Sequence, residues 1–149
     1  MRLYFDCCCY NRPFDDLSQN RIHDVLSLMN RCRASQYHTV LGSTILQMEI
    51  AKISDSIKKA KVSSLSSIIS EAILYAPAIQ QRAMELQQLE TIRKMDSLHL
   101  VSAEAGHADV FLSTDDKLLK ACHRIQDKLK VQVKNPLSYR AEVNENDGY

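Results

Sequence analysis

Two hydrophobic patterns alternate along the chain. Short apolar runs bounded by polar or turn residues are typical of buried strands, whereas apolar residues that recur every three or four positions are typical of helices. We predict strands at the short runs, which are RLYF (2–5), HTVLGS (38–43), ADVFLS (108–113) and KVQVKN (130–135). AILYA (72–76) predicts a further short extended piece. Pro136 is expected to end the last strand.

Helical spacing fills the intervals between these runs. The predicted helices cover residues 17–34, the segment that carries Ile45, Leu46, Ile50 and Ile53, and residues 57–70, 77–89, 95–106 and 114–129. Ser43 or Thr44 suits the start of the second helix, Pro77 suits a first turn, and Gly106 suits a C-terminal cap. Residues 11–16, with Pro13 among them, predict a loop.

Strands that alternate with helices predict an α/β fold, in which a mostly parallel central sheet lies between two layers of helices. The crossovers between parallel strands are expected to be right-handed. The sequence shows no internal repeat, low-complexity run or linker. We therefore predict one domain over residues 1–140 and a polar, frayed tail over residues 141–149.

Composition narrows the classes of function. The chain has 149 residues, of which 45% are hydrophobic and 25% charged, and its net charge is +1. It is not a polycation, so binding to nucleic acid requires a local basic patch. No apolar run approaches the roughly 18 residues that cross a bilayer, and MRLYFD is charged too early for a signal peptide. We therefore expect a cytoplasmic protein without a membrane segment.

Cysteine and glycine usage excludes several familiar sites. The five cysteines contain no C-x-x-C pair, which argues against structural zinc, and their odd number argues against a disulfide framework. We interpret them as reduced thiols, and the triplet Cys7, Cys8 and Cys9 as small buried residues. With three glycines, the chain has no glycine-rich phosphate loop and no G-x-S-x-G elbow.

Four acids far apart in the sequence are expected at one edge of the sheet. Ligands bind beyond the carboxyl ends of parallel strands, where Asp6 ends the first strand and Asp115 follows residues 108–113. Glu49 and Asp96 lie early in helices whose N-termini point to the same edge. Four uncompensated carboxylates raise one another's pKa values, and a hard divalent cation, Mg²⁺ or Mn²⁺, removes this conflict.

Each acid also has an ordinary structural interpretation. Asp6 suits a turn, Glu49 a solvated helix face, Asp96 a helix cap, and Asp115 and Asp116 the first turn of a helix. His99, three residues after Asp96, either shares the metal site or packs as a buried histidine. Taken together at one sheet edge, the four acids favour the metal site.

Four segments carry a resemblance to a known family. They are YFDCCCYNRPFDD, LGSTILQMEI, KMDSLHLVSAEAGHADVFLSTDDKLL and VKNPLSY. From its first strand to about Tyr139, the chain resembles PIN domains, and among them the VapC-like ribonuclease toxins of type II bacterial toxin–antitoxin pairs. The family often has a threonine after its first aspartate, and Cys7 stands at that position in this chain.

The resemblance implies a PIN-like nuclease domain with a catalytic quartet: Asp6, Glu49, Asp96 and Asp115. Asp6, Asp96 and Asp115 would bind Mg²⁺ or Mn²⁺, one or two ions per chain. Glu49 would hold a water or a second ion, and Asp116 would be an accessory acid. The implied activity is that of an endoribonuclease toxin, which hydrolyses RNA phosphodiester bonds. The implied partners are an RNA substrate, a cognate antitoxin and a second copy of the chain.

Basic residues near the acids are candidates for contact with RNA. Lys117, Lys120, Arg124 and Lys128 form one helical stripe, Lys58, Lys59 and Lys61 form a second cluster, and Arg12 lies in the predicted loop. These side chains either bind a polyanion or form a solvated face. We select Arg12 and Lys117 first, because they are nearest in sequence to the acids, and Lys120 after them.

Two other functions stay open. A phosphoaspartate phosphatase would carry D-x-D after the first strand, where this chain has DCCC. A catalytically weak or inactive PIN-like module that binds RNA or protein would keep the fold, and Cys7 beside the site is compatible with it. The apolar positions before Leu89 also exceed what one sheet face buries, which predicts a symmetric dimer. Those positions are Ile68, Ile69, Ile73, Leu74 and Ile79.

Overall fold

The structure, a computed structural model, describes residues 1–14 and 22–146. Within these ranges the strands are β1 (Arg2–Phe5), β2 (Thr39–Ser43), β3 (Glu71–Ile73), β4 (Val110–Leu112) and β5 (Gln132–Lys134). The α-helices are α1 (Cys7–Asn11), α2 (Ile22–Ala34), α3 (Thr44–Ala51), α4 (Ser56–Leu65), α5 (Pro77–Leu89), α6 (Lys94–Ala105), α7 (Asp116–Arg124) and α8 (Pro136–Asn146). Short 3-10 helices are η1 (Arg12–Phe14), η2 (Ser66–Ile68) and η3 (Gln126–Lys128).

The five strands form one parallel sheet in the order β3-β2-β1-β4-β5. In β1, Leu3 and Phe5 face one helix layer, and Tyr4 faces the other together with Phe111 of β4. Successive side chains of a strand point to opposite faces. Because helices cover both faces, residues 3–5 and 110–112 are all buried, which explains why these runs are continuously apolar in the sequence.

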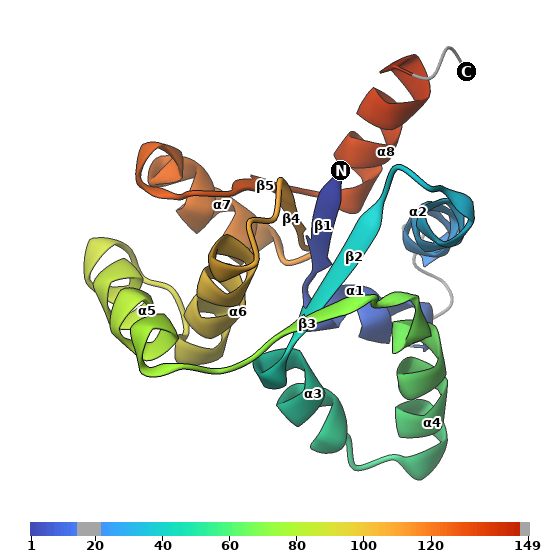
Figure 1. The fold of residues 1–149 in the computed structure, drawn as a ribbon, viewed down its shortest axis with the longest axis horizontal. Helices are drawn as coiled ribbons and strands as arrows, with labels where there is room; N and C mark the ends of the chain where they lie inside the picture. The colour runs from blue at the N-terminus through green and yellow to red at the C-terminus, as the bar shows by residue number, and fades with distance from the viewer. Residues whose placement is uncertain (15–21, 147–149) are drawn as a thin grey trace.

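The two helix layers lie on opposite faces of the sheet (Figure 1). Helices α5, α6 and α7 pack with Tyr4 and Phe111 in one core, and α1, α2, α4 and α8 pack with Leu3 and Phe5 in the other. This is the predicted three-layer α/β fold. Among the described residues, none of the helices has the length and hydrophobicity needed to cross a membrane.

Most predicted elements are present, several with shorter bounds. The helix predicted over 57–70 ends at Leu65 and is followed by η2, and the helix predicted over 114–129 ends at Arg124, before η3. The extended piece predicted at 72–76 is an edge strand, β3, which pairs with β2. Residues 15–16 of the predicted loop and 17–21 of the predicted first helix lie outside the described residues.

Two helices differ from the sequence-based expectation. The loop predicted at residues 11–16 is helical where the structure describes it, because Asn11 ends α1 and Arg12–Phe14 form η1. The Asp6 side chain caps α1 by accepting from the Cys7 N–H. Pro136 begins α8 and does not merely end a strand. Proline lacks an N–H and suits a first helical turn, and Asn135 Oδ1 accepts from the Leu137 N–H at 2.8 Å. Helix α8 continues to Asn146, through positions predicted as polar tail.

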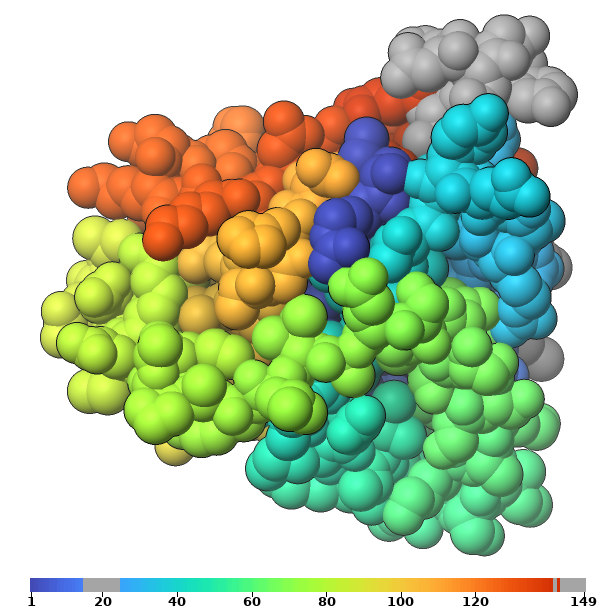
Figure 2. Space-filling model, in the orientation of Figure 1, coloured from blue at the N-terminus to red at the C-terminus, as the bar shows by residue number. Residues whose placement is uncertain are grey.

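Four of the five apolar residues that predict a dimer pack within the chain. Ile79 is buried, and Ile68, Ile69 and Ile73 are partly buried against the two cores. Leu74 is 76% exposed, in the segment between β3 and α5 that crosses the face viewed in Figure 2, next to α3. The apolar surplus is therefore smaller than the sequence indicates, and the dimer itself stays a prediction.

Candidate functional site

The four acids singled out by the sequence line one cavity of about 510 Å³ at the carboxyl edge of the sheet. We call this cavity the acid pocket. Its lining residues are Asp6, Cys7, Cys8, Asn11, Glu49, Arg93, Lys94, Met95, Asp96 and Asp115. The structure thus brings together four carboxylates that are separated by up to 109 positions in the sequence, Asp6 to Asp115.

Sheet topology explains this convergence. Asp6 directly follows β1, Asp115 lies three residues after the neighbouring strand β4, and Glu49 lies on α3, which begins where β2 ends. Asp96 arrives differently, because α6 follows helix α5 and not a strand. The far end of α6 leads into β4 at the amino edge of the sheet, where the Asp109 N–H bonds the Arg2 carbonyl oxygen. The start of α6 therefore lies at the carboxyl edge.

Asp6 is held firmly and is almost wholly buried. Its Oδ1 accepts from the Cys7 N–H at 2.8 Å, and its Oδ2 accepts from the Ser113 hydroxyl at 3.1 Å. Asp6 is 5% exposed. Burial, and then the charges of Cys8 and Asp96, raise the pKa of Asp6 well above its ordinary value. The carboxylate therefore lacks a sufficient counter-charge.

Asp115 and Asp116 are adjacent in sequence but face different surroundings. Asp115 precedes α7 and caps it, because its Oδ1 accepts from the N–H groups of Lys117 and Leu118 at 3.0 and 3.2 Å. Its Oδ2 takes no part in the cap and contacts Arg93 instead. Asp116 is an exposed first-turn residue of α7 and does not line that pocket. This separation limits the repulsion between the two neighbouring acids.

Arg93, which the sequence reasoning missed, bridges two of the acids. Its Nε lies 3.1 Å from Asp96 Oδ2, and its Nη2 lies 3.0 Å from Asp115 Oδ2. Burial raises the pKa of Asp96, although the positive charge of Arg93 opposes this. The spacing of Arg93 and Asp96, three residues apart at a helix start, was the available signal. The contact with Asp115 depends on the tertiary fold.

Glu49 is anchored from behind by a buried chain of hydrogen bonds. His99 Nε2 lies 2.8 Å from Glu49 Oε1, and His99 Nδ1 lies 2.7 Å from the Tyr4 hydroxyl. The Tyr4 hydroxyl lies 2.6 Å from Ser43 Oγ, which also caps α3 by accepting from the Leu46 N–H. Although burial opposes it, the hydrogen bond and charge of His99 lower the pKa of Glu49. His99 is a packed residue that does not line the acid pocket.

Two thiols also line the acid pocket. Hydrogen bonds with Cys9, Ser113 and Thr114 lower the pKa of Cys8 to about 5, against the effect of burial. Burial and the nearby Glu49 raise the pKa of Cys7. All five cysteines are free, and Cys8 is the one that is not fully buried. Four of the five thiols are buried, as expected, whereas Cys8 is partly accessible and its Sγ lies 3.5 Å from Asp6 Oδ2.

The donor set of the acid pocket fits a hard divalent cation. Carboxylate oxygens are the ligands that Mg²⁺ and Mn²⁺ prefer, and burial leaves Asp6 and Asp96 in need of positive charge. Asn11 Oδ1 is buried and has no hydrogen-bond partner in the described part of the chain, so it can accept from a water in the pocket. Across residues 1–14 and 22–146, no three His, Cys, Asp or Glu side chains are grouped ready for an ion. Asp96 and Asp115 bind Arg93 instead, so an ion between them requires that Arg93 move.

The predicted RNA-binding residues differ in their distance from the acids. Lys117 lines a second cavity, of about 280 Å³, which also contacts Arg93, Asp96 and Asp115. Lys120 is exposed on α7 and lines neither cavity, and Arg12, in η1, does not line the acid pocket. The predicted stripe is broken, because α7 ends at Arg124 and Lys128 lies in η3.

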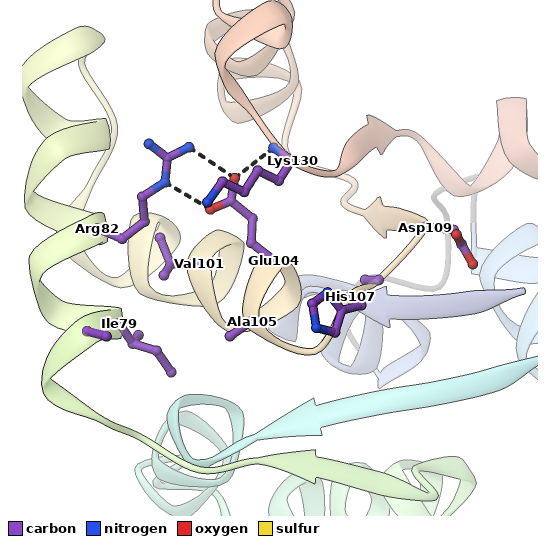
Figure 3. A pocket seen from close by; sticks show the side chains of 10 residues that line it. Ile79, Arg82, Val101, Glu104, Ala105, His107, Asp109 and Lys130 are labelled. Carbon is purple, nitrogen blue, oxygen red and sulfur yellow. Dashed lines mark hydrogen bonds and ion pairs between the residues drawn. The ribbon is translucent and has the colours of Figure 1, made fainter.

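Another cavity, also of about 510 Å³, lies near the opposite end of α6 (Figure 3). Figure 3 shows Arg82 of α5 and the backbone of Lys130 directed at Glu104. Arg82 Nε and Nη2 lie 3.0 and 3.2 Å from the two oxygens of Glu104, and the Lys130 N–H donates to Oε2 at 2.8 Å. These contacts join α5, α6 and the approach to β5. Glu104 is thus bound by groups of the protein itself and holds these elements together. For this reason the acid pocket is the better functional candidate.

Comparison with known proteins identifies a similar fold. No family model and no curated protein matches the sequence. Among solved structures, the chain resembles one chain of VapBC2 from Rickettsia felis, determined bound to a DNA fragment from their promoter. The TM-score is 0.61 with 16% sequence identity, over 91% of this chain and 98% of that chain. At this identity the likeness establishes the fold: the chain has a PIN-like α/β/α architecture, as its sequence resemblance predicts.

Proposed function

We propose that the protein is a metal-dependent endoribonuclease and the toxin of a toxin–antitoxin pair. The observation that carries the proposal is the gathering of Asp6, Glu49, Asp96 and Asp115 in one cavity at the carboxyl edge of the sheet. The PIN-like fold and the VapC-like motifs support the choice of RNA as substrate. Oxygen ligands without a histidine cluster support Mg²⁺ or Mn²⁺ as cofactor.

Asp6, Asp96 and Asp115 would hold the cation. When bound, it supplies positive charge that activates a water and stabilises the charge developing on the phosphate. Ser113 and the Cys7 N–H hold the Asp6 carboxylate in place. The first N–H groups of α7 hold Asp115.

The remaining residues of the site act on water and on the substrate. His99 fixes the Glu49 carboxylate at the pocket wall, where it can orient a water. Lys94 in the acid pocket and Lys117 in the adjoining cavity attract the phosphates of a single strand. No serine–histidine pair and no covalent intermediate are needed for this hydrolysis.

The partners follow from the same proposal. A VapC-like toxin requires an antitoxin that blocks its cleft, and the likeness to a VapBC2 chain supports such a partner. We also propose a homodimer, in which the exposed Leu74 and Tyr75 beside α3, and Met48 on it, provide apolar contact. Tyr75 is placed against α3, because its N–H donates to Thr44 Oγ1 at 3.1 Å. Light scattering of the purified chain gives its mass in solution and tests this assembly.

Cleavage of a mixed RNA pool tests the activity. Wild-type protein should cleave RNA with Mn²⁺ and lose activity in EDTA. Asp6→Asn and Asp115→Asn should each reduce cleavage by about 10²–10³-fold, the range found when one group that stabilises transition-state charge is removed. Asp116→Asn is the matched control, because it makes the same charge change one residue from Asp115 and outside the pocket. Melting curves of each variant would show whether folding is preserved.

A catalytically weak RNA- or protein-binding module is the second candidate. Two observations favour it: Cys7 replaces the threonine that the family often carries, and Arg93 bridges Asp96 and Asp115 where a cation would bind. This module would bind RNA or protein without cleaving it. EDTA-resistant cleavage, or full activity in both aspartate variants, would reject the nuclease mechanism, whereas binding without cleavage by the wild type would support the module.

A further inference from the structure

The Arg93 guanidinium is an exposed cation that bridges two acids. Asp115 is fixed because its other oxygen caps α7, and the Asp96 side chain is 15% exposed. The Arg93 side chain is 77% exposed, and its hydrogen bonds to Asp96 and Asp115 are the contacts that position its guanidinium. Because the Arg93 side of both ion pairs is open to water, solvent screens them in part. The guanidinium is therefore the group that can leave, whereas the carboxylates stay.

The position of Arg93 is also the junction of two cavities. Arg93, Asp96 and Asp115 line both the acid pocket, of about 510 Å³, and the smaller cavity, of about 280 Å³. Lys94 lines the first cavity and Lys117 the second. A side chain that bridges the two shared acids separates these spaces. If it withdraws, the two cavities become one groove, with the acids in its middle and a lysine on either side.

A divalent cation and the guanidinium compete for the same oxygens. A small ion of charge +2 coordinates carboxylate oxygens directly and at about 2 Å, whereas Arg93 contacts Asp96 and Asp115 through hydrogen bonds at 3.1 and 3.0 Å. Once displaced, the planar guanidinium stays tethered at the start of α6, beside the groove. Its fork of N–H donors matches two oxygens of a phosphate.

We infer that Arg93 is a metal-responsive substrate-binding residue: it bridges Asp96 and Asp115 in the metal-free protein, yields these acids to a divalent cation, and then binds an RNA phosphate at the junction of the two cavities. This inference rests on the proposed nuclease function. It adds to that function the place where the RNA strand lies and the coupling between metal binding and RNA binding. Metal binding thereby promotes RNA binding.

Calorimetric titration with Mn²⁺ tests the competition without relying on activity. Arg93→Gln removes the competing charge, so it should bind Mn²⁺ about threefold to thirtyfold more tightly than the wild type, because two partly screened ion pairs no longer compete with the ion. Arg124→Gln is the matched control. Arg124 is 57% exposed, pairs with Glu90 at 2.8 Å and lines neither cavity. Its replacement by glutamine removes the same charge as Arg93→Gln. The control should bind Mn²⁺ as the wild type does.

Kinetics at saturating Mn²⁺ test the second step. Arg93→Gln should raise KM for RNA several-fold and change kcat less, and Arg93→Lys should recover part of the loss, because lysine keeps the charge but not the fork. Equal Mn²⁺ affinity of Arg93→Gln and wild type would overturn the competition, as would an equal gain in Arg124→Gln. A KM no higher than that of the wild type would overturn the phosphate contact. If Mn²⁺ affinity rises as expected but no protein cleaves RNA, the competition stands and the nuclease proposal fails.

Discussion

His99 Nε2 lies 2.8 Å from Glu49 Oε1, and this contact joins helices α6 and α3 at the wall of the acid pocket. Because the pKa of Glu49 is lowered, its carboxylate accepts and the Nε2 of His99 carries the hydrogen. On the other side of the ring, His99 Nδ1 lies 2.7 Å from the Tyr4 hydroxyl. The pocket wall is thus connected to the centre of the sheet through fully buried groups.

Tyr4→Phe should destabilise the protein without changing its fold. The substitution removes one hydroxyl and leaves His99 Nδ1 and Ser43 Oγ without their shared partner, which costs about 1–2 kcal/mol for buried groups. Urea denaturation measures the change in the free energy of unfolding. Tyr37→Phe is the control, since Tyr37 is 84% exposed and should show no change. Equal stability of the two variants would contradict the importance of the buried chain.

The stability of the metal-free protein should depend on pH through Asp6. Its pKa is raised well above the ordinary 3.8, mainly by burial. At pH values above 3.8 the folded protein therefore keeps a proton that the unfolded chain has lost, and the unfolding free energy falls as pH rises through the folded-state pKa. Asp6→Asn removes this penalty. The variant should gain stability over the wild type as pH rises from about 4 to 7 in EDTA.

Denaturation curves at several pH values measure this difference, with Asp116→Asn as the control. Asp116→Asn makes the same change at an exposed residue outside the acid pocket. A constant difference between Asp6→Asn and wild type at all pH values would show that the Asp6 pKa is not raised. Addition of Mn²⁺ should stabilise the wild type more than Asp6→Asn, since the ion binds the folded state.

Cys8 should be the first cysteine to react with iodoacetamide near pH 7. Its pKa is lowered to about 5 and it is partly accessible, whereas Cys9, Cys32 and Cys122 are buried, with burial raising their pKa values. Mass spectrometry of peptides after brief labelling identifies the modified residue. Because Cys8 lines the acid pocket, Mn²⁺ should slow its labelling. Equal rates at Cys8 and Cys32 would be inconsistent with this environment.

Lys117→Gln should weaken RNA binding more than Lys120→Gln. Lys117 lines the cavity beside Asp96 and Asp115, and Lys120 does not. A plot of the logarithm of the binding constant against the logarithm of the salt concentration has a negative slope. Loss of one phosphate contact should reduce the size of this slope by about one. Fluorescence anisotropy of a labelled single strand in EDTA, at several salt concentrations, measures both quantities without cleavage. If the two variants lose affinity equally, α7 acts as a diffuse basic face and not as part of a defined path.

Local pattern was sufficient to predict the layers of the fold and the place of the acids. The apolar runs around Leu3 and Phe111 indicate strands buried on both faces, because their side chains alternate between two cores. Asp6 directly follows one such run and Asp115 lies three residues after the other, and parallel strands end at a common edge. Helix ends were harder to predict from pattern alone, as Pro136 shows: a proline that ends a strand is equally suited to begin a helix.

Tertiary structure alone decided which group each acid meets. The bond between Arg93 and Asp115 spans 22 positions, that between His99 and Glu49 spans 50, and that between Ser113 and Asp6 spans 107. None of these pairs has a spacing that local geometry dictates; each depends on how α3, α6, α7 and β1 pack together. The environment of Cys8 depends likewise on Ser113 and Thr114, far along the chain. Burial and long-range partners determine which groups of a site are charged, and both depend on the folded structure and not on local sequence.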